Sequence, residues 1–357
     1  MIKNDSTYIK LLKKKNDAKG TKKKLKGIIF TRACCCLGII IYHYFCHSKG
    51  EFKFFYHTAN SHFGFMFVTS FFCISGVVLY YNYPKIISIK SFYYKRWKSI
   101  LLPYYICYIY FFLRTAFDKH KLFYRGDWIR IFISLTGLDG YLSLRIKTYG
   151  LIGEWFIGPL IIIYVIYPLL LFQISKFNII INNIIICFLY FLMYKKNIFS
   201  YCKTMNIITC ITSFYFGIET LRFQNFYLTN KKSFILSCFL LILLCTIKIE
   251  INIDIIIFQI QGFSLFIVLY QIGEYVMETK WNLLFNEIGN LSYSIFLFHH
   301  KIILDVLSLY NPVEWYAIIL LLLIIIFLTI ICAKIHCMVV NSVVKSYLFK
   351  IIDTLFI

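Results

Sequence analysis

The sequence contains few charged residues for its length. Only 15% of its 357 residues are Asp, Glu, Lys or Arg, against about 25% in average soluble domains, while 60% are hydrophobic. A water-soluble fold of this size could not hide that much apolar surface, and the same composition excludes a disordered chain. No glycine period or heptad repeat is present, which excludes collagen and coiled coils. With these classes excluded, the lipid bilayer is the environment that suits this composition, and we expect an all-α integral membrane protein.

Acidic residues are especially scarce. The chain has 16 Asp and Glu against 38 Lys and Arg, which gives a formal net charge of +22. In a soluble protein this charge would suggest a nucleic-acid partner. Here the basic residues cluster between apolar stretches, where positive charge retains loops on the cytoplasmic side of a membrane. We therefore expect membrane lipids as neighbours and no nucleic acid.

Metal-binding and secretion signals are also missing. The 13 cysteines form no CxxC pair or Cys/His cluster with zinc-ligand spacing, and most lie in apolar runs, where a thiol behaves as a small hydrophobe. His43 and His47 have i, i+4 spacing, but no HExxH glutamate accompanies them. We assign no metal and no permanently bound cofactor. Residues 1–27 are polar, carry ten lysines and precede no cleavage site, so the N-terminus is expected to stay in the cytoplasm.

Ten apolar segments have roughly the 20 residues that a spanning helix needs. An even number of spans would place both termini in the cytoplasm, and the basic loops 84–97 and 222–232 obey the positive-inside rule in that orientation. Segment 118–152 would lie outside, and its WIRIFISLTGL stretch is too short to span. We predict a basic tail (1–27), a membrane domain (28–340) and a second cytoplasmic tail (341–357). The expected spans are 28–48, 61–83, 98–117, 153–173, 178–194, 205–221, 233–249, 253–272, 286–307 and 313–340.

Ionisable residues inside apolar spans indicate function because each is costly in the bilayer. Arg32 and His43 lie 11 residues apart, so on one helix they would project from nearly the same face, about 16.5 Å apart along the axis. A guanidinium suits phosphate, and an imidazole can accept a proton from an attacking hydroxyl. Two structural alternatives remain: Arg32 as an anchor that snorkels to the headgroups, and His43 as a satisfied core histidine.

Several segments together resemble a known family. They are FTRACCCLGIIIYHYF in the first span, FFCISGVVLYY at 71–81, SFYYKRWKSILLPYY at 91–105, GEWFIGPLIIIYVIYPLL at 153–170 and LSYSIFLFHHKII at 291–303. In this order and spacing they are similar to the acyltransferase-3 family of integral membrane acyltransferases, which includes O-acetyltransferases of bacterial surface glycans. The resemblance covers residues 28 to 335.

The resemblance implies roles for individual residues. The family's Arg-x10-His falls on Arg32 and on His43, which would be the catalytic histidine. Its FFxxSG motif ends at Ser75 and Gly76, although these small residues can also serve close helix packing. Its late histidine motif falls on His299, with phenylalanine in place of the usual tyrosine. His299 is equally open to a supporting or structural role.

Two further groups follow from the resemblance. Arg96 matches a basic motif, Ser99 stands where a second arginine is usual, and Lys95 and Lys98 lie beside them. Glu154, next to Trp155, opens the fourth span on the expected outer side, where it would orient His43, bind sugar hydroxyls or only cap its helix.

The implied activity is acyl transfer in the bacterial cytoplasmic membrane. Acetyl-CoA would donate an acetyl group to a hydroxyl of a surface polysaccharide or its lipid-linked precursor. Its phosphates would bind near Arg32, Arg96, Lys95 and Lys98, and His43 would act as base or transient acyl carrier. A polysaccharide flippase or polymerase, or another multi-span transporter, is the alternative. Such a protein would not require these motifs in this order, and the paired broken spans typical of transporters are not found in the sequence.

Overall fold

The computed structural model describes residues 25–49, 63–124, 126–143, 145–150, 152, 155–196, 203–246, 254–346 and 354. All regular elements in these residues are helices, which confirms the all-α prediction. The long helices are α2 (Lys26–His47), α4 (Phe63–Asn82), α5 (Ile89–Asp118), α8 (Ile157–Lys176), α9 (Ile179–Lys196), α10 (Ile207–Arg222), α12 (Lys231–Thr246), α13 (Asp254–Val276), α14 (Asn282–Leu309) and α15 (Trp315–Lys345).

Each predicted span coincides with one of these helices, but only six of the described helices are long and apolar enough to cross a membrane by length and composition. They are α2, α4, α5, α8, α13 and α15. Helices α10 and α12 have 16 residues each, so they rise about 24 Å, less than the roughly 30 Å hydrocarbon core. Helix α14 has 28 residues but carries several ionisable side chains. Length and composition alone therefore do not support the predicted count of ten.

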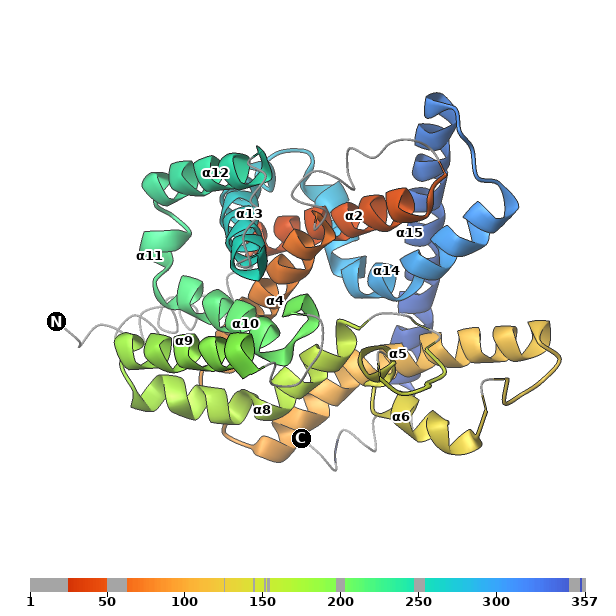
Figure 1. Cartoon of the computed structure of the whole chain (residues 1–357), viewed down its shortest axis with the longest axis horizontal. Coiled ribbons are helices and arrows are strands. Elements are labelled where there is room, and N and C mark those ends of the chain that lie inside the picture. The colour runs from red at the N-terminus through yellow and green to blue at the C-terminus, as the bar shows by residue number, and fades with distance from the viewer. Residues whose placement is uncertain are drawn as a thin grey trace.

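Helix α2 lies at the centre of the molecule, packed against α4, α13 and α14 (Figure 1). Its first turn is tied to α13, because the Gly27 amide donates to the Glu274 carboxylate. Its last turn is tied to the segment after α14, because the side-chain amide of Asn311 donates to the His47 carbonyl at 3.2 Å. Tyr44, fully buried, donates its hydroxyl to the Ile318 carbonyl on α15. These contacts fix both ends of α2.

Contacts along the helices define their relative directions. Helices α2 and α14 run parallel, because Ile29 lies against Gly289 and His47 lies against His300. Helices α2 and α4 are antiparallel, since Gly38 meets Phe67 while Tyr42 meets Gly64 further back along the second helix. Helices α5 and α14 are parallel, as shown by the contacts Ile100–Tyr293 and Arg114–Asp305. Helices α9 and α10 are antiparallel, as shown by Met193–Thr209 and Asn183–Tyr215. Helices α12 and α13 are also antiparallel, as shown by Leu244–Gln261 and Ser233–Gln271.

Two glycines allow α4 and α10 to touch backbone to backbone. A Cβ atom on Gly76 would lie 2.1 Å from the Phe214 carbonyl oxygen, and one on Gly217 would lie 2.1 Å from the Cys73 carbonyl oxygen. Both distances are far below van der Waals contact. Small residues that permit close approach are typical of helix packing in membranes, where no hydrophobic force drives helices together. Gly76 therefore permits close packing of α4 against α10, which is the structural alternative given above for the Ser-Gly motif.

The outer surface of several helices is strongly apolar. Exposed side chains on α15 include Leu320, Leu323 and Phe327, each more than half exposed, as expected for a face in contact with lipid. The loop after α5 contains only short helices, a 3-10 turn (Trp128–Arg130), α6 (Ile131–Leu135) and α7 (Asp139–Leu142). Trp128 and Phe132 there are exposed. The described residues of this segment do not form a spanning helix, as predicted.

Candidate active site

Helix α2 carries the two residues that the sequence singles out. Arg32 lies in its first half and His43 one turn before its end. Eleven residues of α-helix correspond to a rise of about 16.5 Å with only about 20° of rotation away from three full turns. The side chains therefore leave α2 in similar directions at two separate levels, and each level meets a different set of neighbours.

The arginine cluster, which we define as Arg32, Ser75, Arg96 and Tyr164, brings together side chains from α2, α4, α5 and α8. Tyr164 lies within hydrogen-bonding reach of the Ser75 and Arg96 side chains and interacts electrostatically with Arg32. Arg96 also donates to the Tyr83 hydroxyl at 3.2 Å, with its guanidinium carbon 4.9 Å from that ring's centroid. Three predicted residues, Arg32, Ser75 and Arg96, thus meet around one tyrosine that the sequence analysis missed.

The arginine cluster has an excess of positive charge. Within the described residues, no carboxylate forms an ion pair with Arg32 or Arg96. The Nε of Arg96 is buried and makes no hydrogen bond there. A guanidinium offers paired donors that match phosphate oxygens, so two of them without an acidic partner have the chemistry that a phosphorylated anion would require.

Lys95 and Lys98, the remaining predicted basic residues, flank Arg96 on α5. Lys95 and Lys98 are half-buried, and the Lys98 ammonium lies 5.9 Å from the centroid of the Tyr94 ring. The structure therefore joins Arg96 to Arg32 through Tyr164, whereas the described contact of Lys98 is with an aromatic ring.

The histidine cluster, which we define as His43, His47, His299 and His300, joins the end of α2 to the middle of α14. The His43 ring lies between its partners, with ring centroids 5.3 Å from His299 and 5.0 Å from His300. The Nε2 atoms of His47 and His300 are 3.2 Å apart. His299 is buried, His43 and His300 are half-buried, and His47 is exposed. The cluster thus runs from the interior to the surface.

His299 has a defined proton position. Its Nδ1 lies 2.8 Å from the Phe296 carbonyl oxygen, and because a carbonyl only accepts, Nδ1 must carry the proton. In a neutral ring the lone pair is then on Nε2. Phe296 is the position where the family usually has tyrosine, and its backbone orients the histidine three residues later. The structure therefore places the late histidine beside His43, with its ring centroid 5.3 Å away.

The start of α8 adjoins the same end of the bundle. The Phe156 ring packs against Phe72, with centroids 4.7 Å apart, and against Phe296, with centroids 5.2 Å apart. Trp155 is half-buried and lies 6.5 Å from Phe72. Glu154 lies outside the described residues. Phe156 therefore lies against the turn that orients His299.

The geometry contains two groups that the sequence analysis did not find. Tyr164 is one of 29 tyrosines, and no spacing distinguishes it from the others. His300 directly follows His299, so the pair of adjacent histidines was a visible signal. Residues next to each other on a helix point about 100° apart, so the sequence alone does not show that both histidines face α2.

A comparison with protein families identifies the chain. The profile described as an acyltransferase domain matches residues 25–335, nearly the whole chain. The chain belongs to the acyltransferase-3 family. No curated protein and no solved structure matches it. Membership in this family, together with the apolar helices, makes the protein a multi-pass membrane acyltransferase. All members of the arginine and histidine clusters lie within the matched range.

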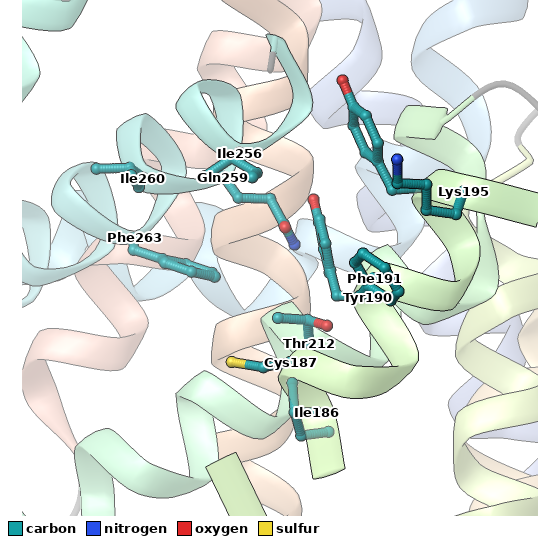
Figure 2. A pocket seen from close by; sticks show the side chains of 11 residues that line it. Ile186, Cys187, Tyr190, Phe191, Lys195, Thr212, Ile256, Gln259, Ile260 and Phe263 are labelled. Atoms are coloured by element: carbon teal, nitrogen blue, oxygen red, sulfur yellow. The ribbon is translucent and has the colours of Figure 1, made fainter. Parts of the chain in front are cut away.

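An apolar cavity of about 550 Å³ lies elsewhere, between α9, α10 and α13 (Figure 2). Tyr190 and Phe191 from α9 line one wall, and Gln259 and Phe263 from α13 line the other. Gln259 donates to the Thr209 carbonyl and to the Ser213 hydroxyl, both at 2.9 Å. None of the residues that the sequence assigned to the site lines this cavity, so it does not belong to the candidate active site.

Proposed function

We propose that the protein transfers an acetyl group from acetyl-CoA to a hydroxyl of a cell-surface polysaccharide or its lipid-linked precursor in the bacterial cytoplasmic membrane. The observation that carries this proposal is the arrangement along α2. Helix α2 contributes Arg32 to a cluster of two guanidinium groups at one level and His43 to a group of imidazoles about 16.5 Å further along its axis. A long donor with phosphates at one end and a thioester at the other fits that separation.

The arginine cluster is the proposed donor site. The phosphates of coenzyme A would accept hydrogen bonds from Arg32 and Arg96, with Lys95 and Lys98 adding positive charge nearby. Tyr164 would help to hold the Arg96 guanidinium in place, and Ser75 would act through Tyr164, since that tyrosine interacts with both side chains. The acyl end of the donor would extend along α2 toward the histidine cluster.

His43 is the proposed catalytic residue. In the direct route, its unprotonated nitrogen takes the proton of the acceptor hydroxyl while the oxygen attacks the thioester carbonyl. The carbon–sulfur bond then breaks, and the coenzyme A thiolate recovers that proton from the imidazolium. In the covalent route, His43 itself carries the acetyl group before the acceptor attacks. His299 supports His43 in either route, and Glu154 would orient the acceptor or the imidazole.

We further propose that all ten long helices cross the membrane with both termini in the cytoplasm. The contact directions support this, because alternating crossings make the first and ninth helices parallel and neighbouring helices antiparallel. The described pairs α2–α14, α5–α14, α2–α4, α9–α10 and α12–α13 follow that pattern. The short helices α10 and α12 would then be matched by local thinning of the bilayer.

Reporter fusions test the crossing pattern. A reporter active only outside the cytoplasm should be silent after residue 26, 90 or 345 and active near residue 55 or 310. Silence at 310 with activity at 345 would mean that the pattern is displaced by one crossing and would overturn the ten-helix arrangement.

Glycan analysis tests the activity. Surface glycans are compared by mass spectrometry between a deletion strain and the same strain complemented with the gene. Complementation should add the mass of one acetyl ester to the repeating unit, and alkaline treatment should remove it. Identical glycans with and without the protein would contradict polysaccharide acylation.

A further inference from the structure

Three imidazoles at the outer end of α2 form a group that acyl transfer does not require. His43, His47 and His300 each offer a ring nitrogen, and these atoms all lie within 4.8 Å of one another. His43 and His47 come from one face of α2, and His300 comes from α14. The sequence showed only the first two, which was too little to suggest a metal. The fold supplies the third ligand.

We propose that His43, His47 and His300 bind a first-row divalent cation with the chemistry of Zn²⁺. Three imidazoles suit zinc, copper and nickel, and three protein ligands leave a fourth position for water. The proposed site includes the catalytic histidine itself as one ligand, whereas His47 and His300 are given no part in acyl transfer.

The spacing of the nitrogen atoms supports a tetrahedral site. With Zn–N bonds of about 2.0–2.1 Å, neighbouring ligand nitrogens in a tetrahedron lie about 3.3 Å apart. The His47 and His300 Nε2 atoms are already 3.2 Å apart. Because two such nitrogens otherwise share a single proton, replacing that proton by a cation keeps the same separation. Rotation of the half-buried His43 ring then completes the ligand set.

The anchoring of both ligand-bearing segments also supports the site. The Asn311 side chain accepts from the Lys49 amide and donates to the His47 carbonyl, which holds the end of α2 against the chain after α14. A site whose ligands are held before the ion arrives loses less entropy on binding. Exposed His47 gives the ion a route from solvent.

The cation would control the enzyme, an inference that rests on the proposed function. A metal bond to His43 occupies the lone pair that must accept the hydroxyl proton. The metal-bound protein should therefore be inactive, and removal of the ion should restore transfer. His47 and His300 would act only through the cation.

Metal binding can be measured without any assay of acyl transfer. The full-length protein in detergent is loaded with ZnCl₂ or CoCl₂, desalted and analysed for metal content, and the cobalt form is examined for the intense visible bands of a tetrahedral site. Wild type and the control His120→Ala, a change in an exposed loop, should retain one ion per chain. His47→Ala, His300→Ala and His300→Asn should bind at least about tenfold more weakly, because even the loss of a group that only orients a ligand typically costs about 10–100-fold in metal affinity. No retained ion in the wild type, or equal retention in the ligand variants, would overturn the site.

Inhibition is tested separately from binding. Micromolar ZnCl₂ should block acyl transfer by wild type, a chelator should reverse the block, and His47→Ala should remain active at the same zinc concentration. Full activity of zinc-loaded wild type would overturn the control role. A protein that binds zinc at these residues but acylates nothing when metal-free would contradict the proposed function and leave the metal site standing.

Discussion

The two levels of α2 are built differently. The arginine cluster draws one side chain from each of four helices, and its cations keep their charge at any physiological pH. The histidine cluster is made by α2 and α14 alone, and an unprotonated imidazole can accept a proton from a reacting hydroxyl. A fixed charge held from four sides suits binding, whereas a proton-exchanging group between two parallel helices suits chemistry. The contrast predicts that changes at the first level alter donor affinity and changes at the second level alter turnover.

The largest effect should come from removing the imidazole at the catalytic level. General-base assistance typically contributes about 10²–10⁴-fold in rate, so His43→Ala should abolish detectable glycan acylation. The readout is ester content in a complemented deletion strain, with protein level checked by immunoblot. His47→Ala, in metal-free medium, is the control and should keep much of the activity. Normal acylation by His43→Ala, or a loss that only follows loss of protein, would restore the structural-histidine interpretation.

A smaller effect is expected at the binding level. Arg32→Lys keeps the charge but loses the paired donors, so the apparent KM for acetyl-CoA should rise about tenfold with kcat nearly unchanged, because hydrogen bonds to charged groups contribute about 1.5–3 kcal/mol. Arg145→Lys, in an exposed loop, is the matched control. If Arg32→Ala shows a normal donor response with full activity, Arg32 is only a headgroup anchor and the contrast between the two levels disappears.

A packing change should affect both levels together. Gly76→Ala forces a Cβ to within 2.1 Å of the Phe214 carbonyl oxygen, and overpacking of this kind costs about 1–3 kcal/mol. The amount of inserted protein and its melting temperature in detergent should fall. In the protein that remains folded, KM and kcat should change by similar factors, if they change. Ser75→Ala, one residue earlier, lacks this clash and serves as the control for stability. A selective rise in KM with normal stability would assign Gly76 to the donor site.

The smallest effect should come from the tyrosine within the arginine cluster. Tyr164→Phe removes one hydroxyl near Arg96 and Ser75, and a single hydrogen bond contributes about 0.5–1.5 kcal/mol. The KM for acetyl-CoA should rise about two- to tenfold, without a change in kcat. Tyr110→Phe, on the exposed face of α5, is the control. A fall in kcat instead would mean that Tyr164 acts at the catalytic level.

The sequence predicted the parts of the site that depend on one helix. Arg32 and His43 belong together because helical periodicity relates residues 11 positions apart, and this needs no knowledge of neighbours. The apolar runs likewise predicted where each helix lies. Whether each helix crosses the membrane is harder to predict, because α10 and α12 are short and α14 carries charges. Two of these charges are paired only in the folded bundle, Asp305 with Arg114 of α5 and Glu287 with Lys334 of α15.

Contacts between distant helices could not be predicted in the same way. Tyr164 meets Arg96 and Arg32 because α8 packs beside α5 and close to α2, and no local pattern encodes that packing. His300 meets His47 because α2 and α14 run in the same direction with a register fixed near Gly289 and Ile29. A one-turn difference in this register would have left His47 without a partner.

The placement of both levels on one uninterrupted helix has a consequence for how this chain can change over generations. Substitutions between positions 32 and 43 alter side chains but leave the spacing intact. A single-residue insertion there would turn everything beyond it by about 100° and advance it by about 1.5 Å, which would aim His43 away from α14. Loss of one residue would do the same in the opposite sense. We therefore expect descendants of this sequence to accumulate replacements within α2 but to tolerate length variation only outside it, in segments such as the loop after α5.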